Sequence, residues 1–286
     1  MAAAVWRQRR RPPLAEASAS SSSPGIVFEC PDGRLGLHVV HTRFLISQAK
    51  ATLLFSASRL QLMETFLLKS LRAQTSQRFV LYAAHDPKLP AVTLQPFLDA
   101  LRSLGARAVI HAERTTAMEL GFAALVDQLS AADPRVRNAE LFVTSRWDLD
   151  DAAHVGAVEG VQALACGGGG EGAGQAVRVV YLASTGALWF PSASKGAYGE
   201  IRTPLPSFKI YRSLAIMQSL ILSGAALLRT CPLNVYSYPH WKPQALEKMR
   251  VEGCAFDFSA ERDILHWAPP AGELSWLYVK TVRSPG

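Results

Sequence analysis

Apolar segments of strand length alternate with amphipathic segments of helical length along residues 35–144, and this alternation constrains the fold more than any other feature. The apolar runs predict strands over 35–41, 78–84, 106–111 and 140–144. Apolar residues at helical spacing predict helices over 59–74, 94–104 and 118–129. Strands and helices that alternate in this way form βαβ units. We therefore predict an α/β, Rossmann-like fold with a mixed, mostly parallel sheet flanked by helices.

The pattern is less regular after residue 144. We predict a helix over 152–165, strands over 177–183 and 187–190 that form a hairpin, and a helix over 211–229. The intervening 166–174 is glycine-rich but lacks the G-K-[S/T] ending of a phosphate-binding P-loop, so we interpret it as a surface loop. No internal repeat or linker divides the chain after residue 26. The expected organisation is a tail over 1–25 and a single domain over 26–286.

The ends of three predicted strands mark the expected ligand site. In open α/β sheets, ligands bind beyond the carboxyl ends of the strands. That rule points to Thr42 and Arg43, to His85 and Asp86, and to the residues that follow Thr144.

An acidic cluster directly follows the strand over 140–144. Its sequence is T-S-R-W-D-L-D-D, so that Asp148, Asp150 and Asp151 stand within four residues. Carboxylates this close raise one another's pKa unless a cation or hydrogen-bond donors neutralise them. Mg²⁺ and Mn²⁺ take carboxylate ligands from one or two residues and complete their shell with water and phosphates. In extended backbone, Arg146, Asp148 and Asp150 share one face, and Arg146 is suited to a carboxylate or a phosphate.

Other acidic motifs explain the cluster less well. A plain solvated turn remains possible, and so does an N-cap role for Asp151 at the helix expected from Ala152. A calcium loop starting at Asp148 would place Ala152 and Ala153 where an oxygen ligand and a glycine are needed. A phosphatase of the haloacid dehalogenase type needs Thr or Val where this chain has Ala152.

The strand followed by T-x-R-x-D-x-D-D resembles the D-x-D element of GT-A glycosyltransferases. More narrowly, the chain resembles the putative rhamnosyltransferase family. The segments that carry this resemblance are His41–Phe44, Leu71–Thr75, Arg146–Asp151 and Trp276–Val279. The resemblance implies a GT-A-like fold for the domain, and a transfer of sugar from a nucleotide-sugar donor to a carbohydrate or other hydroxyl acceptor.

The resemblance also implies roles for particular residues. Asp148 and Asp150 would hold Mn²⁺ or Mg²⁺ and, through it, the donor diphosphate. Asp151 would position metal-bound water or donor hydroxyls. Arg43 and Arg146 are candidate donor contacts, and His240 is a candidate further metal ligand, a part for which His266 competes.

The general base and the exact reaction stay open at this point. Asp257, Glu261 and Asp263 are candidate bases, and none of them is favoured. A metal-dependent phosphohydrolase or nucleotidyltransferase would use the same acidic cluster. A non-catalytic relative that binds carbohydrate is the third alternative.

Charge and composition limit the classes of ligand that the protein is expected to bind. The formal net charge is +7, and residues 1–25, with four arginines and one glutamate, contribute three of those charges. The mild remaining excess suits an anionic ligand such as a nucleotide diphosphate. A dense basic stripe with interleaved aromatic residues, which nucleic-acid binding would require, is missing from the sequence.

The tail over 1–25 and the cysteines give evidence on the cellular compartment in which the protein is found. The tail over 1–25 is rich in Arg, Ala and Ser, which is typical of an organellar transit peptide or of a disordered segment. The most apolar run, 214–228, contains polar residues and is too short for a transmembrane segment. Four widely spaced cysteines favour free thiols in a reducing compartment, although two disulfides are compatible with the count. We therefore expect a soluble protein, cytoplasmic or organellar.

Overall fold

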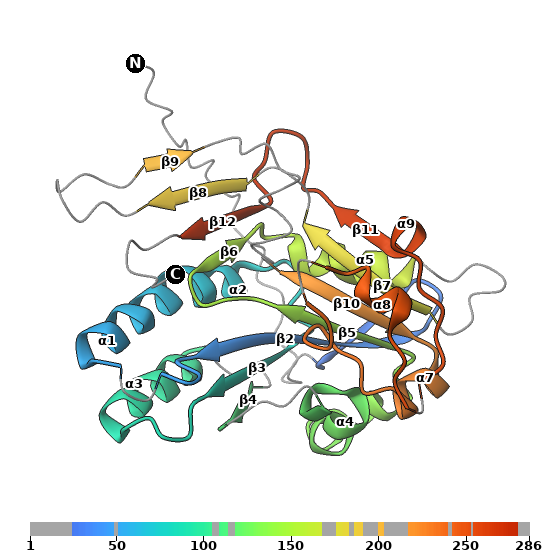
Figure 1. The fold of residues 1–286 in the computed structure, drawn as a ribbon, viewed down its shortest axis with the longest axis horizontal. Helices are drawn as coiled ribbons and strands as arrows, with labels where there is room; N and C mark the ends of the chain where they lie inside the picture. The colour runs from blue at the N-terminus through green and yellow to red at the C-terminus, as the bar shows by residue number, and fades with distance from the viewer. Residues whose placement is uncertain are drawn as a thin grey trace, which may run out of the picture.

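The computed structural model describes residues 25–48, 51–104, 109–113, 118–167, 176–182, 186–190, 200–202, 217–239, 242–252 and 254–279. Their centre is an eight-stranded sheet (Figure 1). The order is β11-β7-β10-β5-β2-β3-β4, and β1 pairs with β2. Its strands are β1 (Val27–Glu29), β2 (Leu35–Phe44), β3 (Val80–His85), β4 (Val109–Ala112), β5 (Leu141–Arg146), β7 (Ala176–Leu182), β10 (Gln218–Ser223) and β11 (Ile264–Trp267).

Most pairs in this sheet are parallel. β2 pairs in parallel with β3 and β5, β3 with β4, and β11 with β7. β10 is antiparallel to both of its neighbours, and β1 is antiparallel to β2. The predicted α/β class with a mixed, mostly parallel sheet is therefore confirmed.

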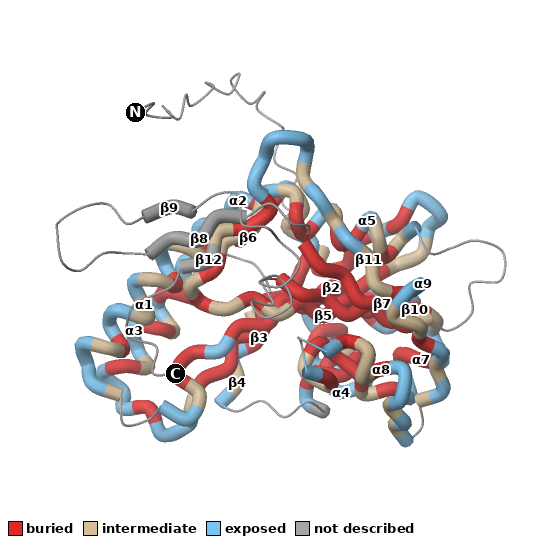
Figure 2. Tube along the Cα trace, turned by 45° about the horizontal axis from the view of Figure 1, so that its top comes forward, coloured by how far each residue is buried: buried red, intermediate tan, exposed pale blue. Residues whose placement is uncertain are grey.

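Helices cover both faces of the sheet, which makes its central strands the most deeply buried part of the fold (Figure 2). In β3, Leu81 and Ala83 join the apolar cluster beneath the helices of one face, whereas Val80, Tyr82 and Ala84 join the cluster of the opposite face. The first face is covered by α1 (Leu53–Leu62), the π-helical segment η1 (Met63–Leu68), α2 (Lys69–Ala73), α3 (Ala91–Arg102) and α5 (Ala157–Cys166). The second is covered by α4 (Phe122–Ser130), α7 (Ala225–Thr230) and α8 (Ala245–Lys248).

Shorter helical segments complete the chain. Two 3₁₀ segments, Met118–Leu120 and Pro134–Asn138, flank α4, and α9 (Ala260–Asp263) precedes β11. The helices expected over 59–74, 94–104 and 118–129 are confirmed, although the first two begin earlier than predicted. The first begins at Leu53 because the Thr52 hydroxyl accepts the N–H of Phe55 as an N-cap. Each described helix falls short of the length and apolarity needed to cross a membrane.

Two predictions for the second half are wrong, and the helix expected over 152–165 is confirmed except for its first residues. The residues expected to open a helix at Ala152 form β6 (Asp151–Ala153), and α5 begins only at Ala157. The expected hairpin does not form, because β7 joins the main sheet while β8 (Gly186–Phe190) joins a second one. The helix expected over 211–229 is replaced, within its described part, by β10 followed by α7.

The second sheet is small and has the order β6-β12-β8-β9. Its other members are β12 (Trp276–Val279) and β9 (Glu200–Arg202). β6 directly follows the acidic cluster and pairs antiparallel with β12, with Asp151 opposite Tyr278. β12 therefore lies beside the residues that leave the cluster (Figure 1).

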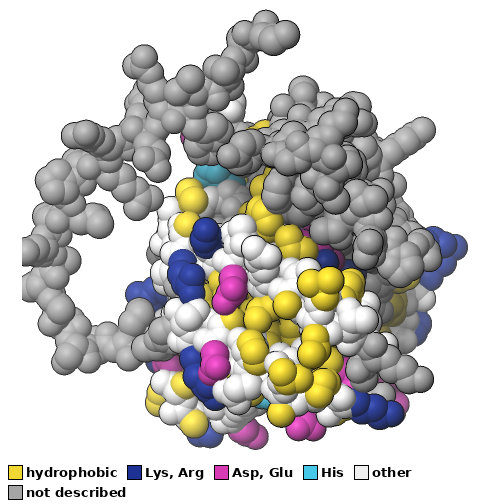
Figure 3. Space-filling view, turned by 90° about the vertical axis from the view of Figure 1, so that its left-hand side faces the viewer, with side chains coloured by type: hydrophobic (Ala, Val, Ile, Leu, Met, Phe, Trp, Pro, Cys, Tyr) yellow, Lys and Arg dark blue, Asp and Glu magenta, His cyan; other side chains and the backbone are white. Residues whose placement is uncertain are grey.

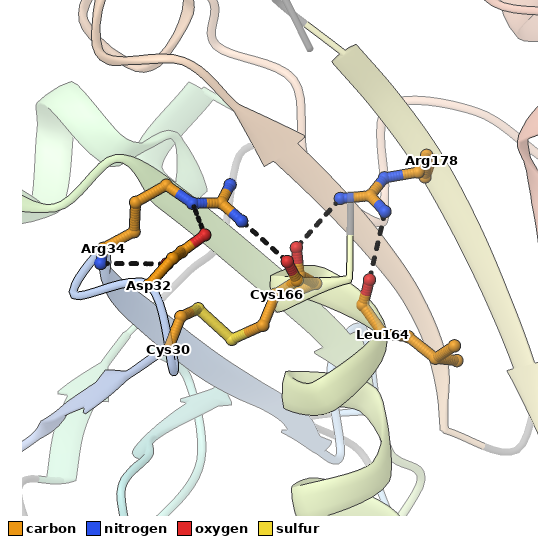
Figure 4. The surroundings of a disulfide bond; sticks show 7 residues. Cys30, Asp32, Arg34, Leu164, Cys166 and Arg178 are labelled. Atoms are coloured by element: carbon orange, nitrogen blue, oxygen red, sulfur yellow. Dashed lines mark hydrogen bonds and ion pairs between the residues drawn. A yellow bond between two sulfur atoms is a disulfide. The ribbon is translucent and has the colours of Figure 1, made fainter. Parts of the chain in front are cut away.

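The expectation of free thiols is also wrong. Cys30 is bonded to Cys166, and Cys231 to Cys254. The first disulfide joins the turn between β1 and β2 to the last residue of α5 (Figure 4). Spacing along the chain gave no signal for it, because 136 residues separate the two cysteines.

Two arginines donate hydrogen bonds to carbonyls at the same end of α5. Arg34 donates to the carbonyl of Cys166 at 2.6 Å, and Arg178 donates to the carbonyls of Leu164 and Ala165, both at 3.0 Å (Figure 4). The last carbonyls of a helix lack partners within the helix, and cations near them are favoured by the helix dipole. This helix end is thus fixed both covalently and by charge.

An apolar area is exposed on the side formed by α1 and α3 (Figure 3). Leu53 and Leu54 at the start of α1, and Val92 at the start of α3, are exposed. Hydrophobic side chains gather on this face of the space-filling view.

A buried polar chain crosses the middle of the sheet. The His38 ring in β2 lies 2.7 Å from the Ser145 hydroxyl in β5, which lies 2.6 Å from the Ser219 hydroxyl in β10. The Gln162 amide of α5 approaches the other His38 ring nitrogen at 3.4 Å. Burial lowers the pKa of His38 to about 3, so this imidazole is neutral in the folded protein.

This shift predicts a loss of stability in acid. Between about pH 6.5 and about pH 3 the unfolded His38 binds a proton that the folded protein excludes, so the free energy of unfolding falls as the pH falls. His38→Gln should reduce that slope by up to about 1.4 kcal/mol per pH unit. Urea unfolding of both proteins across this range measures the two slopes. Parallel curves would contradict the prediction.

Candidate functional site

The acidic cluster lies at the edge where parallel strands end. In the pairing of β2 with β3 and β5, Arg43 stands opposite Ala84, and His41 stands opposite Arg146. The pairing continues one residue further, since the N–H of Trp147 donates to the carbonyl of His41 at 2.8 Å. The three aspartates follow directly. They therefore occupy the position where open α/β sheets bind ligands.

Two apolar residues anchor the cluster to the core. Trp147 is fully buried and Leu149 nearly so, and both belong to the apolar cluster beneath α1, α3 and α5. The Trp147 indole N–H donates to the carbonyl of Asp151 at 3.2 Å. Alternation of apolar and acidic residues thus fixes the backbone from which the carboxylates project.

Asp148 is held by the arginine two residues before it. Arg146 donates from Nε and Nη2 to the two carboxylate oxygens, at 3.3 and 3.1 Å. The Asp148 side chain remains 34% exposed, so solutes can reach it. Arg146 and Asp148 do share a face, as their spacing in extended backbone predicts.

Asp150 contacts a different arginine. Arg59 in the last turn of α1 donates to both of its oxygens, at 2.9 and 3.5 Å. The chain turns before this point, since the N–H of Asp151 donates to the carbonyl of Asp148 at 3.2 Å. The extended register assumed from the sequence therefore ends at Asp148. No sequence pattern marks Arg59 as a site residue, because it lies 91 residues from its partner.

Asp151 is buried and begins a strand. It does not cap a helix, because α5 starts six residues later with Gly156 as its N-cap. Both carboxylate oxygens lack a hydrogen-bond partner among the described residues. Burial raises the pKa of this carboxyl well above its usual range, and Asp148 and Asp150 raise it further.

An aromatic ring covers the other side of the cluster. The Arg43 guanidinium lies 4.7 Å from the centre of the Tyr236 ring, and the Arg146 guanidinium lies 5.8 Å from it. Burial raises the pKa of Tyr236 to about 12, so its hydroxyl stays protonated. The loop that carries Tyr236 is fixed to β5, because the N–H of Val235 donates to the Thr144 hydroxyl at 2.9 Å. Sequence reasoning did not select Tyr236.

A cation fits the chemistry of this site. The buried Asp151 carboxylate has no partner in the described structure, and Asp148 and Asp150 add hard oxygen donors. No group of three or more His, Cys, Asp or Glu residues within the described ranges is arranged as a complete metal site. Mg²⁺ does not require one, since it typically takes one or two carboxylates plus substrate phosphates. His240, the candidate further ligand, lies outside the described residues.

The candidate bases lie elsewhere. Asp257 bridges Ala176, the first residue of β7, which places it at the amino-terminal edge of the sheet. Arg262 pairs with both Asp257 and Asp263, and Glu261 lies in the same exposed segment. The structure therefore does not bring these carboxylates to the acidic cluster. His266, the competing candidate for a further metal ligand, lies in β11 opposite Tyr181 of β7, and β7 and β10 separate β11 from β5 in the sheet.

A cavity of about 660 Å³ lies away from the cluster. It is lined by residues of the β1–β2 turn, of the segment before β3 and of α5, among them Asp32, Arg78, Glu159 and Gln162. Arg78 precedes β3, so the cavity lies at the amino-terminal edge of that strand. The candidate site is therefore assigned from the acidic cluster, not from this cavity.

Solved structures offer distant likenesses. TarS 1–349 from S. aureus, solved in complex with UDP, is 14% identical with a TM-score of 0.41; the match covers 85% of this chain and 60% of TarS 1–349. The inositol-1-phosphate CTP transferase from T. maritima is 11% identical with a TM-score of 0.33, over 87% of this chain and 92% of that one. A cytidylyltransferase from Leptospira borgpetersenii is 11% identical with a TM-score of 0.32, over 80% and 77%.

Family comparison bears directly on the cluster. No curated protein matches the chain significantly. The model of the family described as putative rhamnosyl transferase, however, matches residues 46–170, a stretch that begins after β2, ends after α5 and contains all three aspartates. This match confirms the resemblance to the putative rhamnosyltransferase family that the sequence motifs indicated.

Proposed function

We propose that this protein is a metal-dependent glycosyltransferase, which moves a sugar from a nucleotide-sugar donor to a carbohydrate or other hydroxyl acceptor. The observation that carries the proposal is the acidic cluster at the carboxyl edge of the parallel strands, lying within the stretch that matches the family. The family's description makes nucleotide-linked rhamnose the first donor to test.

The reaction breaks the bond between the sugar's anomeric carbon and the diphosphate, and forms a bond from that carbon to the acceptor oxygen. The acceptor hydroxyl loses a proton, and negative charge develops on the departing diphosphate. Arg146 pairs with Asp148, and Arg43 lies over the same Tyr236 ring as Arg146, so both supply guanidinium groups suited to phosphate oxygens. Asp148 and Asp150 would hold Mn²⁺ or Mg²⁺, and the ion would act as a Lewis acid toward the diphosphate.

Asp151 has a different part in this proposal. Its side chain is closed off from solvent, and burial raises the pKa of its carboxyl group. In this proposal it orients metal-bound water or a donor hydroxyl. Tyr236 keeps the two arginines in place by stacking.

A donor screen tests the proposal. The full chain is incubated with nucleotide sugars, rhamnose donors included, in the presence of Mn²⁺, and release of nucleoside diphosphate is followed. We expect release from one class of donor, abolished by EDTA and restored by Mn²⁺ or Mg²⁺.

Other outcomes identify the alternatives. Release of inorganic phosphate from generic phosphate esters would favour a phosphohydrolase. Pyrophosphate release from nucleoside triphosphates would favour a nucleotidyltransferase. Absence of any metal-dependent nucleotide binding would favour a non-catalytic relative. Full activity in EDTA would refute the metal requirement alone.

We further propose that the chain folds in an oxidising compartment. Two disulfides support this, since such bonds persist mainly in oxidising environments. When protein from its natural source is denatured without reductant, thiol labelling should find no free cysteine. Labelling of all four would contradict the proposal.

A further inference from the structure

Arg59 links a helix to the acidic cluster across 91 residues of sequence. Its guanidinium lies 2.9 Å from one oxygen of Asp150 and 3.5 Å from the other. The two side chains retain 22% and 14% of their exposure, so the pair borders solvent. Arg59 is therefore positioned where an incoming solute can reach it.

The charge balance at this edge depends on that contact. Two of the three aspartates are paired with arginines, Asp150 with Arg59 and Asp148 with Arg146, while Asp151 has no hydrogen-bond partner in the described structure. A guanidinium has more N–H donors than two contacts use. Arg59 can accordingly bind a second anion in the plane of its guanidinium group.

The helix that carries Arg59 is fixed to the strand that leaves the cluster. The π-helical segment η1 follows α1 directly, and its Met63 and Leu67 are fully buried. Further along, the Ser70 hydroxyl donates to the carbonyl of Ala153 at 3.0 Å and lies 3.1 Å from its N–H. Single π-helical turns within helices frequently occur at functional sites. Arg59 is thus held on a rigid support.

We propose that Arg59 is a binding residue for the donor's diphosphate, and that it exchanges Asp150 for phosphate oxygens when the donor binds. This inference rests on the proposed function. Without nucleotide, Arg59 neutralises Asp150. With nucleotide and cation bound, Asp150 would be free to hold the cation, and the Arg59 guanidinium would pair with the diphosphate in the bidentate geometry that suits it. Arg59 would then neutralise part of the negative charge that develops on the leaving group.

Calorimetric titrations test this exchange. UDP, GDP, dTDP, the corresponding monophosphates and inorganic pyrophosphate are titrated with Mg²⁺ into wild type, Arg59→Met and Arg59→Lys. We expect Arg59→Met to weaken the preferred diphosphate and pyrophosphate by about tenfold or more, because a charge-assisted pair is lost. Affinity for the monophosphate should fall much less. Arg59→Lys should recover part of the loss.

The matched control is Arg72→Met, since Arg72 is an exposed arginine of the same helical run whose guanidinium donates to the carbonyl and the hydroxyl of Ser103. It should bind like wild type. Equal losses for mono- and diphosphates in Arg59→Met, accompanied by a lower Tm, would show a structural role and overturn the inference. Unchanged affinities would overturn it too. If wild type binds neither a diphosphate nor pyrophosphate, the proposed function itself fails, and the wild-type titration alone shows this.

Discussion

Asp148→Asn is expected to lower the rate of sugar transfer by about 100-fold or more, the effect typical of removing one group that stabilises developing charge in an active site. Asparagine keeps the shape of the side chain but loses the charge that holds a divalent cation. The fold should be almost unaffected. The Asp148–Arg146 pair is one-third exposed on the Asp148 side, and pairs near solvent contribute at most about 1 kcal/mol.

The matched control is Asp127→Asn in α4. Asp127 is 91% exposed, and its nearest cation, Arg137, lies 4.0 Å away. Steady-state kinetics on the three proteins, together with their melting temperatures, separate chemistry from folding. Transfer by Asp148→Asn at the control's rate would exclude Asp148 from the site. A large fall in its Tm would show a structural role instead.

Removal of the Cys30–Cys166 disulfide should have the largest effect on stability. This bond closes a loop of 136 residues, and the loop-entropy model assigns such a bond about 5 kcal/mol. The Cys231–Cys254 bond closes 23 residues, which corresponds to about 3 kcal/mol. Alanine is the suitable replacement, because Cys30 is buried and a serine hydroxyl there would need a partner.

Denaturant unfolding of the two double variants, Cys30→Ala with Cys166→Ala and Cys231→Ala with Cys254→Ala, measures the difference. We expect the first to lose more stability than the second. The remaining arginine contacts at the end of α5 should keep the first variant folded at low temperature. Equal stability of the first variant and wild type would mean that the disulfide does not constrain the unfolded chain.

Local patterns predicted those strands of the sheet that form short, well-bounded apolar runs. β2, β3 and β5 combine strand length with turn residues or helices at their ends, and the sequence predicted all three. β10 was missed because it lies inside the longer apolar run over 214–228, which has the length of a helix. Such a run lacks the alternation that distinguishes a strand from a buried helix. Its place between β5 and β7 depends on pairings far away in sequence.

In the candidate site too, local contacts could be predicted from the sequence and long-range contacts could not. Arg146 and Asp148 were predicted to share a face because they are two positions apart, and local backbone geometry decides such a contact. The contact of Asp150 with Arg59 depends on how α1 packs against the sheet. The burial of Asp151 depends on pairing between β6 and β12, whose residues lie more than 100 positions apart. Nothing local in the sequence signals either.

The central claim is that this cluster binds a diphosphate through a cation. A single titration tests it most directly: the wild-type protein and the Asp148→Asn, Asp150→Asn double variant, each with the preferred nucleoside diphosphate, in Mn²⁺ and in EDTA. The account predicts binding by wild type in Mn²⁺, little or none in EDTA, and no gain from Mn²⁺ in the double variant. Equal, metal-stimulated affinity in both proteins would contradict it.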